Sequence, residues 1–262
     1  MRKKILGAVV FMLTVLLSGS AVALTAGDVI EKANQANYYQ ADDGRAKVDM
    51  TITDSLGRER KRKMTILRLD APDGEKQKYF IYFDKPDDVK GMTYLVWKKP
   101  GEDDDRWLYL PALDLVRRVA SSDKRSSFVG SHFAYEEISG RGIGEDLHTI
   151  ESEDDSFYRI KSVPKDPNSV EFSYFITLID KETFIPQKEE MYDKNGKLYK
   201  ILESLEVKDI GGYLTITKMK ATDLNAKGFT VCEFSDIGYN VDLKDDIFTE
   251  RYLRRPPRKY IK

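Results

Sequence analysis

The chain has 262 residues, with 43 basic and 44 acidic side chains, so its charge is nearly balanced. That balance argues against a nucleic-acid partner, because nucleic-acid binding calls for a concentrated positive surface. Cys232 is the only cysteine, which excludes an internal disulfide, and two histidines without a ligand spacing give no zinc motif. We therefore expect no metal and no cofactor.

Residues 1–23 have the three parts of a secretory signal. Three basic residues precede the apolar run Ile5–Leu17, and Ala21-Val22-Ala23 forms a small-x-small cleavage site. The apolar run has 13 residues, whereas a membrane-spanning helix needs about 20. We expect cleavage rather than an uncleaved anchor, and a mature chain, residues 24–262, that forms a single domain in the periplasm.

The mature chain begins with a predicted helix and continues mainly as strands. Thr25 is a suitable cap for a helix over 25–38. Residues 46–53 alternate between apolar and polar side chains, the period of a half-buried strand, and a turn leads into a second strand over 58–69. Asn195-Gly196 predicts a tight hairpin between strands over 188–192 and 198–207. The sequence thus favours a meander of antiparallel strands.

Several of the predicted strands are apolar on both faces. Tyr79–Phe83, Trp107–Leu110 and Phe172–Ile179 leave little room for a wet face. A strand in a simple one-sheet protein should show one solvated face. We therefore expect a helix or loop on one side of these strands and the interior of the fold on the other.

Two segments fall outside the strand pattern. Residues 120–155 combine serines and four glycines with the aromatic residues Phe128, Phe133 and Tyr135, and a long segment of this kind is typical of a functional lid. We expect the two phenyl rings to lie outside the packed core and to cover a cavity mouth. The basic tail, residues 254–262, predicts a solvated and loosely ordered end.

No group of residues predicts catalysis. Ser131 and His132 are adjacent, and neighbouring residues on an extended chain point in opposite directions. The sequence also lacks a nucleophile elbow and a phosphate-binding glycine loop. We expect no enzyme. The remaining feature is abundant apolar surface, which either holds a lipid or forms an ordinary core; the composition does not decide between these.

Three motifs resemble a known family. They are Phe83–Met92, Trp107–Val119 and Ser127–Glu137, the last reading Ser-Phe-Val-Gly-Ser-His-Phe-Ala-Tyr-Glu-Glu. They resemble the outer-membrane lipoprotein-sorting family, in particular its LolA-like branch associated with inner-membrane exporters of the resistance-nodulation-division type. The resemblance implies a half-open antiparallel β-barrel of about eleven strands, with a few short helices that form a lid or plug. It also implies a periplasmic carrier.

These observations lead to one functional hypothesis and one alternative. The hypothesis is a monomeric carrier that takes a lipid, or the acyl chains of a lipoprotein, from such an exporter toward the outer membrane; the cargo could be a lipoprotein, a phospholipid or a sterol-like lipid. The alternative is a periplasmic sensor of the same fold that regulates a partner protein. The predicted ligand-binding residues are Met50, Ile52, Met64, Ile66, Tyr82, Tyr94, Val96, Trp107, Tyr109, Phe128, Phe133 and Tyr135.

Overall fold

The computed structural model describes residues 23–72 and 76–261. The predicted signal segment therefore lies, apart from its last residue, outside the described residues. Within the described ranges no helix combines the length and the apolarity that crossing a bilayer requires. The four α-helices are α1 (Ala26–Tyr38), α2 (Tyr135–Ser139), α3 (Glu250–Arg254) and α4 (Arg258–Ile261).

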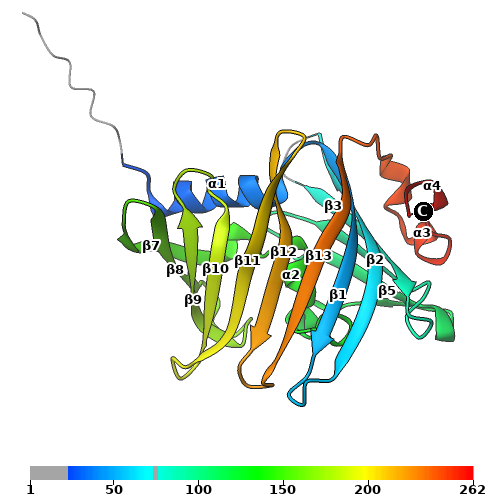
Figure 1. Cartoon of the computed structure of the whole chain (residues 1–262), viewed down its shortest axis with the longest axis horizontal. Coiled ribbons are helices and arrows are strands. Elements are labelled where there is room, and N and C mark those ends of the chain that lie inside the picture. The colour runs from blue at the N-terminus through cyan, green and yellow to red at the C-terminus, as the bar shows by residue number, and fades with distance from the viewer. Residues whose placement is uncertain (1–22, 73–75, 262) are drawn as a thin grey trace, which may run out of the picture.

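A single curved sheet makes up most of the described chain (Figure 1). Its strands are β1 (Asp43–Thr53), β2 (Glu59–Asp70), β3 (Gln77–Lys85), β4 (Thr93–Lys98), β5 (Asp105–Leu110), β6 (Leu115–Arg118), β7 (Asp146–Glu153), β8 (Phe157–Pro164), β9 (Phe172–Asp180), β10 (Pro186–Asp193), β11 (Leu198–Ile210), β12 (Tyr213–Asp223) and β13 (Gly228–Tyr239). All pairings are antiparallel, in the order β6-β5-β4-β3-β2-β1-β13-β12-β11-β10-β9-β8-β7. The sheet is not closed, so the prediction of a half-open antiparallel barrel is confirmed, with thirteen strands among the described residues in place of about eleven.

Aspartates define the tight turns between neighbouring strands. Asp54 Oδ1 accepts hydrogen bonds from the backbone N–H groups of Leu56 and Arg58, which fixes the turn between β1 and β2. Asp193 does the same between β10 and β11, where Gly196 supplies the positive φ of 75° that the turn requires. The predicted hairpin at residues 195–196 is therefore present.

Helix α1 forms as the sequence predicts. Thr25 accepts a hydrogen bond from the backbone N–H of Asp28, whose carboxylate accepts one from the backbone N–H of Thr25, so two otherwise unpaired donors of the first turn are satisfied. Val29, Ile30 and Ala33 are buried against strands β8 and β9. The helix thus covers one end of the inner, concave face of the sheet.

Strands β3 and β5, two of the three strands predicted to be apolar on both faces, are covered on both faces. On β3, Tyr79 and Ile81 belong to the core of the concave face, whereas Phe80 packs on the outer face. The outer core is completed by residues after β13, among them Phe248 and Leu253, from the region of α3 that Figure 1 shows at the side of the barrel. Side chains on both faces of β3 are therefore shielded from solvent.

The expectation of a loosely ordered tail is wrong. Residues 258–261 form α4, and Tyr260 and Ile261 are both buried in the outer core. Burying a large apolar side chain contributes about 1.5–3 kcal/mol, which outweighs the tendency of a terminus to fray. The basic residues Arg258 and Lys259 precede those two apolar side chains and remain exposed.

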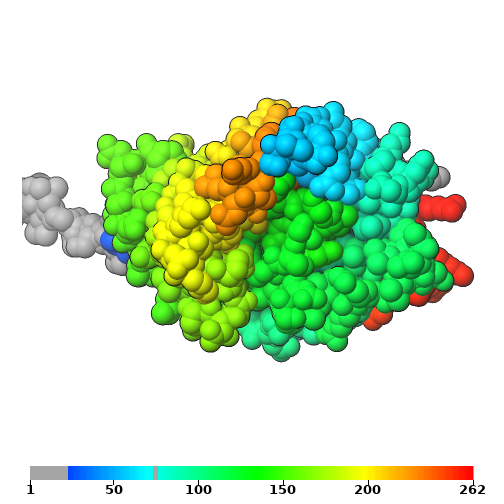
Figure 2. Space-filling model, turned by 90° about the horizontal axis from the view of Figure 1, so that it is seen from below, coloured from blue at the N-terminus to red at the C-terminus, as the bar shows by residue number. Residues whose placement is uncertain are grey.

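The connection between β6 and β7 crosses the interior of the barrel. These two strands follow one another in the sequence but form the opposite edges of the sheet. Residues 119–145, here called the plug, must therefore span the width of the half-barrel. Figure 2, a view from below, shows this part of the chain in green, filling the space between the strand ends. The predicted lid segment ends earlier than expected, because residues 146–153 form β7.

Candidate functional site

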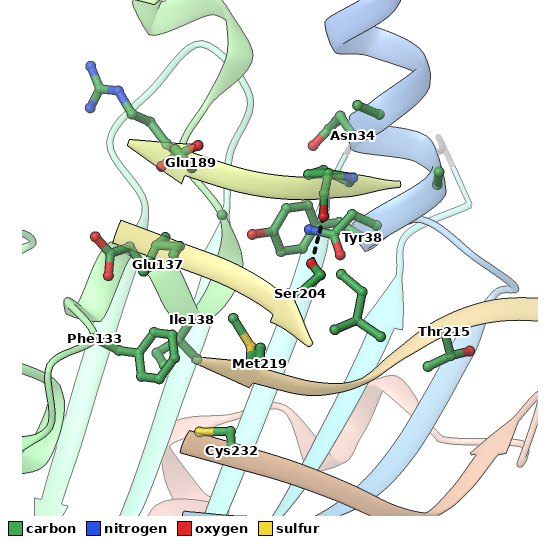
Figure 3. A pocket seen from close by; sticks show the side chains of 18 of the residues that line it. Asn34, Tyr38, Phe133, Glu137, Ile138, Glu189, Ser204, Thr215, Met219 and Cys232 are labelled. Atoms are coloured by element: carbon green, nitrogen blue, oxygen red, sulfur yellow. Dashed lines mark hydrogen bonds between the residues drawn. The ribbon is translucent and has the colours of Figure 1, made fainter. Parts of the chain in front are cut away.

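A cavity of about 390 Å³ lies between α1, the plug and the concave face of the sheet. Figure 3 shows Asn34 and Tyr38 at one side and Met219 and Cys232 toward the opposite wall. The volume falls within the roughly 300–1,000 Å³ typical of sites for small ligands. Apolar side chains from eight strands contribute most of the wall, with Ile30 and Ala33 from the helix. The plug borders the cavity on the side where we predicted that Phe128 and Phe133 cover its mouth.

Five of the twelve predicted ligand-binding residues line this cavity. They are Met50, Met64, Ile66, Phe128 and Phe133. Four more, Ile52, Tyr94, Val96 and Tyr135, belong to the core of the concave face but do not line the cavity. Ligand contact therefore stays a prediction for the first five residues, and the other four support the wall.

The remaining three predicted residues lie on the other face of the sheet. Tyr82, Trp107 and Tyr109 pack in the outer core, away from the cavity. Side chains alternate between faces along a strand, so a register error of one residue exchanges the faces. Where both faces are apolar, the pattern gives no sign of which one is concave. These three residues are accordingly removed from the candidate site.

The plug is anchored by its aromatic residues rather than loosely placed. Phe128 is 0% exposed and packs edge-on against Tyr135, with ring centroids 5.4 Å apart, and lies near Phe83 and Tyr94. Phe133 is 2% exposed. The expectation that both rings lie outside the packed core is therefore wrong, although both border the cavity. Their burial follows from the path of the plug through the barrel interior.

Charged side chains hold the plug to strands β9 to β11. Arg125 pairs with Glu136 at 3.2 Å, with Glu137 at 3.0 Å and with Glu171 at 2.9 Å. Lys200 on β11 adds a 2.6 Å pair with Glu137. The Arg125 side chain is only 8% exposed, and its guanidinium lies 5.3 Å from the ring centre of Phe172. This arrangement is a largely buried network in which Arg125 has three partners and Glu137 has two.

The network keeps its carboxylates ionised. Burial would raise the pKa of Glu137, but the charges of Lys200 and Arg125 outweigh it and lower that pKa below its usual value. The pKa of Glu136 is lowered for the same reason, with Arg125, Arg141 and Lys124 as the opposing charges. Because several charges surround each carboxylate, losing a single cation would leave buried negative charge only partly compensated.

Tyr38 joins α1 to the plug at the other side of the cavity. Its ring lies so close to Gly140 that a Cβ atom there would come within 2.7 Å of the ring, and Gly140 has a φ of 77°. Lys98 lies 5.3 Å from the centre of the same ring, and its ammonium donates to the carbonyl of Ser139. Gly140 is therefore required both by the backbone conformation and by this close approach.

Glu189 differs from the other carboxylates of the cavity. It lines the cavity from β10, and its one hydrogen bond comes from Thr177 Oγ1 at 3.3 Å on the paired strand β9. No cation lies within ion-pair distance of it in the described part of the chain. Burial raises the pKa of Glu189 to about 7, and the negative charge of Glu137 contributes to the shift. No local pattern distinguishes Glu189, because it lies between two other charged residues, Lys188 and Glu190.

The reactive groups considered from the sequence have structural roles. Ser131 Oγ accepts a hydrogen bond from the backbone N–H of Phe133, and His132 Nδ1 lies 2.8 Å from Thr230 Oγ1. The serine and the histidine thus bond to different groups. Burial raises the pKa of the Cys232 thiol to about 12, so this residue behaves as a buried apolar side chain.

Comparison with known proteins places the chain in a family. A family model described as "Uncharacterized protein" matches residues 75–255, more than half of the chain, and the chain belongs to that family. No curated protein sequence matches the chain. The fold nevertheless has well-matched structural relatives.

Three solved structures illustrate the likeness. A DUF1329 family protein from Desulfovibrio piger has a TM-score of 0.81 and 29% identity, covering 87% of this chain and 97% of that one. A domain from Vibrio parahaemolyticus, provisionally named an outer membrane lipoprotein-sorting protein, has a TM-score of 0.80 and 26% identity, covering 88% and 98%. A LolA superfamily protein from Nitrosomonas europaea has a TM-score of 0.67 and 22% identity, covering 88% and 100%, and shows the fold alone. The predicted resemblance to the lipoprotein-sorting, LolA-like family is confirmed.

Proposed function

We propose that this protein is a periplasmic carrier that holds the apolar part of a lipid, or the acyl chains of a lipoprotein, in the cavity between α1, the plug and the sheet. The observation that carries the proposal is this cavity itself, which persists in a barrel whose remaining interior is densely packed. The likeness to a domain provisionally named for outer membrane lipoprotein sorting supports it.

The energetics of apolar burial suit a carrier. Each methylene moved from water to an apolar site contributes about 0.8 kcal/mol, so a 16-carbon chain contributes on the order of 12 kcal/mol before association costs. Association costs begin at roughly 4 kcal/mol, so the net gain is at most about 8 kcal/mol, which is weak enough to allow release. We infer that the chain acts as a monomer that receives its cargo from an inner-membrane exporter of the resistance-nodulation-division type, the partner that the family resemblance implies.

A cavity-filling variant tests the carrier. Met219 lines the cavity, and Met219→Trp should fill part of it and reduce the lipid that co-purifies from the periplasm at least tenfold, as measured by mass spectrometry of extracted lipids. Leu205→Trp is the matched control, because Leu205 lies on the neighbouring strand β11 and is 47% exposed. Wild type and control should carry a stoichiometric lipid. A wild-type protein that neither carries nor binds lipid would overturn the proposal and favour the sensor.

The export route gives a second, independent prediction. If residues 1–23 are a cleaved signal, the intact mass of the periplasmic protein should match a chain that begins at Leu24. Replacing Ala21 and Ala23 with leucine should block cleavage and leave the full-length protein in the membrane fraction. A periplasmic protein that retains residues 1–23 would contradict this assignment.

A further inference from the structure

Charged residues of both signs line the cavity, namely Arg45, Arg68, Arg125, Arg141 and Lys188 with Glu137, Asp146, Glu189 and Glu203. The described network at its plug end joins four cations to five carboxylates, namely Lys124, Arg125, Arg141 and Lys200 with Glu136, Glu137, Glu145, Asp146 and Glu171. Every one of these groups has a partner of opposite charge within the network. Glu189 adds a sixth carboxylate that has no such partner.

Glu189 is directed into the cavity by the pairing of its strand. Thr177 and Leu202 are its direct neighbours on β9 and β11, and both also line the cavity. The side chains on either side of it on β10 face outward, where Lys188 and Glu190 form an ion pair of 2.6 Å. Figure 3 shows Glu189 and Glu137 at the same end of the cavity. Its surroundings are thus an apolar wall, the hydroxyl of Thr177, the carboxylate of Glu137 and the two cations that Glu137 binds.

A carboxylate in such a place has unused acceptor capacity. Two carboxylate oxygens offer about four acceptor positions, and Thr177 fills one of them. The charged groups near Glu189 from the surrounding elements are Arg125 and Glu137 of the plug and Lys200 of β11, with the phenol of Tyr38 from α1. Both cations are already bound to Glu137, so neither neutralises Glu189 directly. A buried charge without a partner is costly, and a ligand cation would remove that cost.

We propose that Glu189 receives the polar head of the cargo and that this head carries a positively charged amino group. The inference rests on the proposed carrier function and narrows its cargo to an amine-bearing amphiphile, such as a lipid with a primary ammonium head. The tail occupies the apolar wall around Met50, Met64 and Met219, and the ammonium donates hydrogen bonds to Glu189. An anionic head beside Glu189 is disfavoured, because it would face the carboxylates of Glu189 and Glu137, while the nearby cations Arg125 and Lys200 are already paired with Glu137.

Competition among ligands with one tail and different heads tests this inference. In this assay the wild-type protein is loaded with the fluorescent probe 1-N-phenylnaphthylamine at pH 8. Hexadecylamine, hexadecanol and hexadecanoate, each below its micelle concentration, are then compared by the concentration at which they displace the probe. We expect the amine to bind at least tenfold more tightly than the alcohol, and the acid to bind most weakly. Since burial raises the pKa of Glu189 to about 7, its carboxylate becomes protonated in acid, and the preference for the amine should shrink at pH 5.5.

Two variants on the same strand locate the effect. Glu189→Gln should reduce the preference for the amine to less than threefold while the alcohol binds as before, and Glu190→Gln, on the outer face, should retain the wild-type order. Tail binding with no preference, or with a preference that Glu189→Gln leaves unchanged, would overturn the inference and leave the carrier intact. A preference for the alcohol that Glu189→Gln abolishes would assign a hydroxyl head instead. Absence of binding by all three ligands would overturn the carrier itself.

Discussion

Replacing Arg125 with methionine is expected to lower the free energy of unfolding by about 3–5 kcal/mol at pH 7, the range found when a buried ion pair loses one partner. Methionine retains an apolar stem but leaves Glu136, Glu137 and Glu171 without a shared cation. Urea unfolding followed by circular dichroism measures the change. Arg58→Met is the control, since Arg58 is 74% exposed and its pair with Asp54 should contribute no more than about 1 kcal/mol.

The pH dependence of this loss identifies its electrostatic origin. The folded-state pKa values of Glu136 and Glu137 lie below the usual value of 4.5, so their contribution is fully present above that pH and is lost as the pH falls through the folded values. The difference between Arg125→Met and wild type should therefore shrink in acid. A difference that stays constant down to pH 3 would mean that Arg125 acts through its packing on Phe172 instead.

The strands and the first helix were predictable because their signals are local. Alternation over 46–53, the Thr25 cap with Asp28, and Asn195-Gly196 each act within a few residues, and the structure has the corresponding strand, helix and hairpin. It was also predictable that some segment covers the outer face of β3 and β5, because strands that are apolar on both faces need a packing partner on each face. Which segment forms this cover was not predictable, because α3 and α4 come from the far end of the chain.

The candidate site was only partly predictable, for two physical reasons. The first is that the concave face of a strand depends on its pairing, which put Tyr82 and Trp107 on the wrong side. The second is that the polar end of the cavity forms from segments far apart in the sequence. Arg125, Glu171 and Lys200 meet only when the plug crosses the barrel, and Glu189 is isolated by the outward pairing of its neighbours. No local sequence pattern predicts contacts between segments that lie so far apart in the chain.

Replacing Phe128 with alanine is expected to lower the free energy of unfolding by about 3–5 kcal/mol, the range for removing a buried phenyl ring from a packed core. The side chain is fully buried and lies 5.4 Å from the rings of both Tyr94 and Tyr135, so its removal opens a hole that its neighbours fill only in part. Leu56→Ala is the control, because Leu56 is 74% exposed in the turn between β1 and β2 and should change stability by no more than about 0.5 kcal/mol.

The size of this loss separates an anchored plug from a mobile lid. A ring that leaves the core whenever the plug opens contributes little to the stability of the folded state, and Phe128→Ala would then cost less than about 1 kcal/mol. A loss of the full size means that residues near Phe128 stay fixed while cargo enters elsewhere. Hydrogen exchange of the Phe128 amide, which donates to the Phe133 carbonyl at 2.7 Å, provides the second measurement. In an anchored plug this amide should exchange as slowly as those of β1 and β2, because it opens only when the barrel itself unfolds.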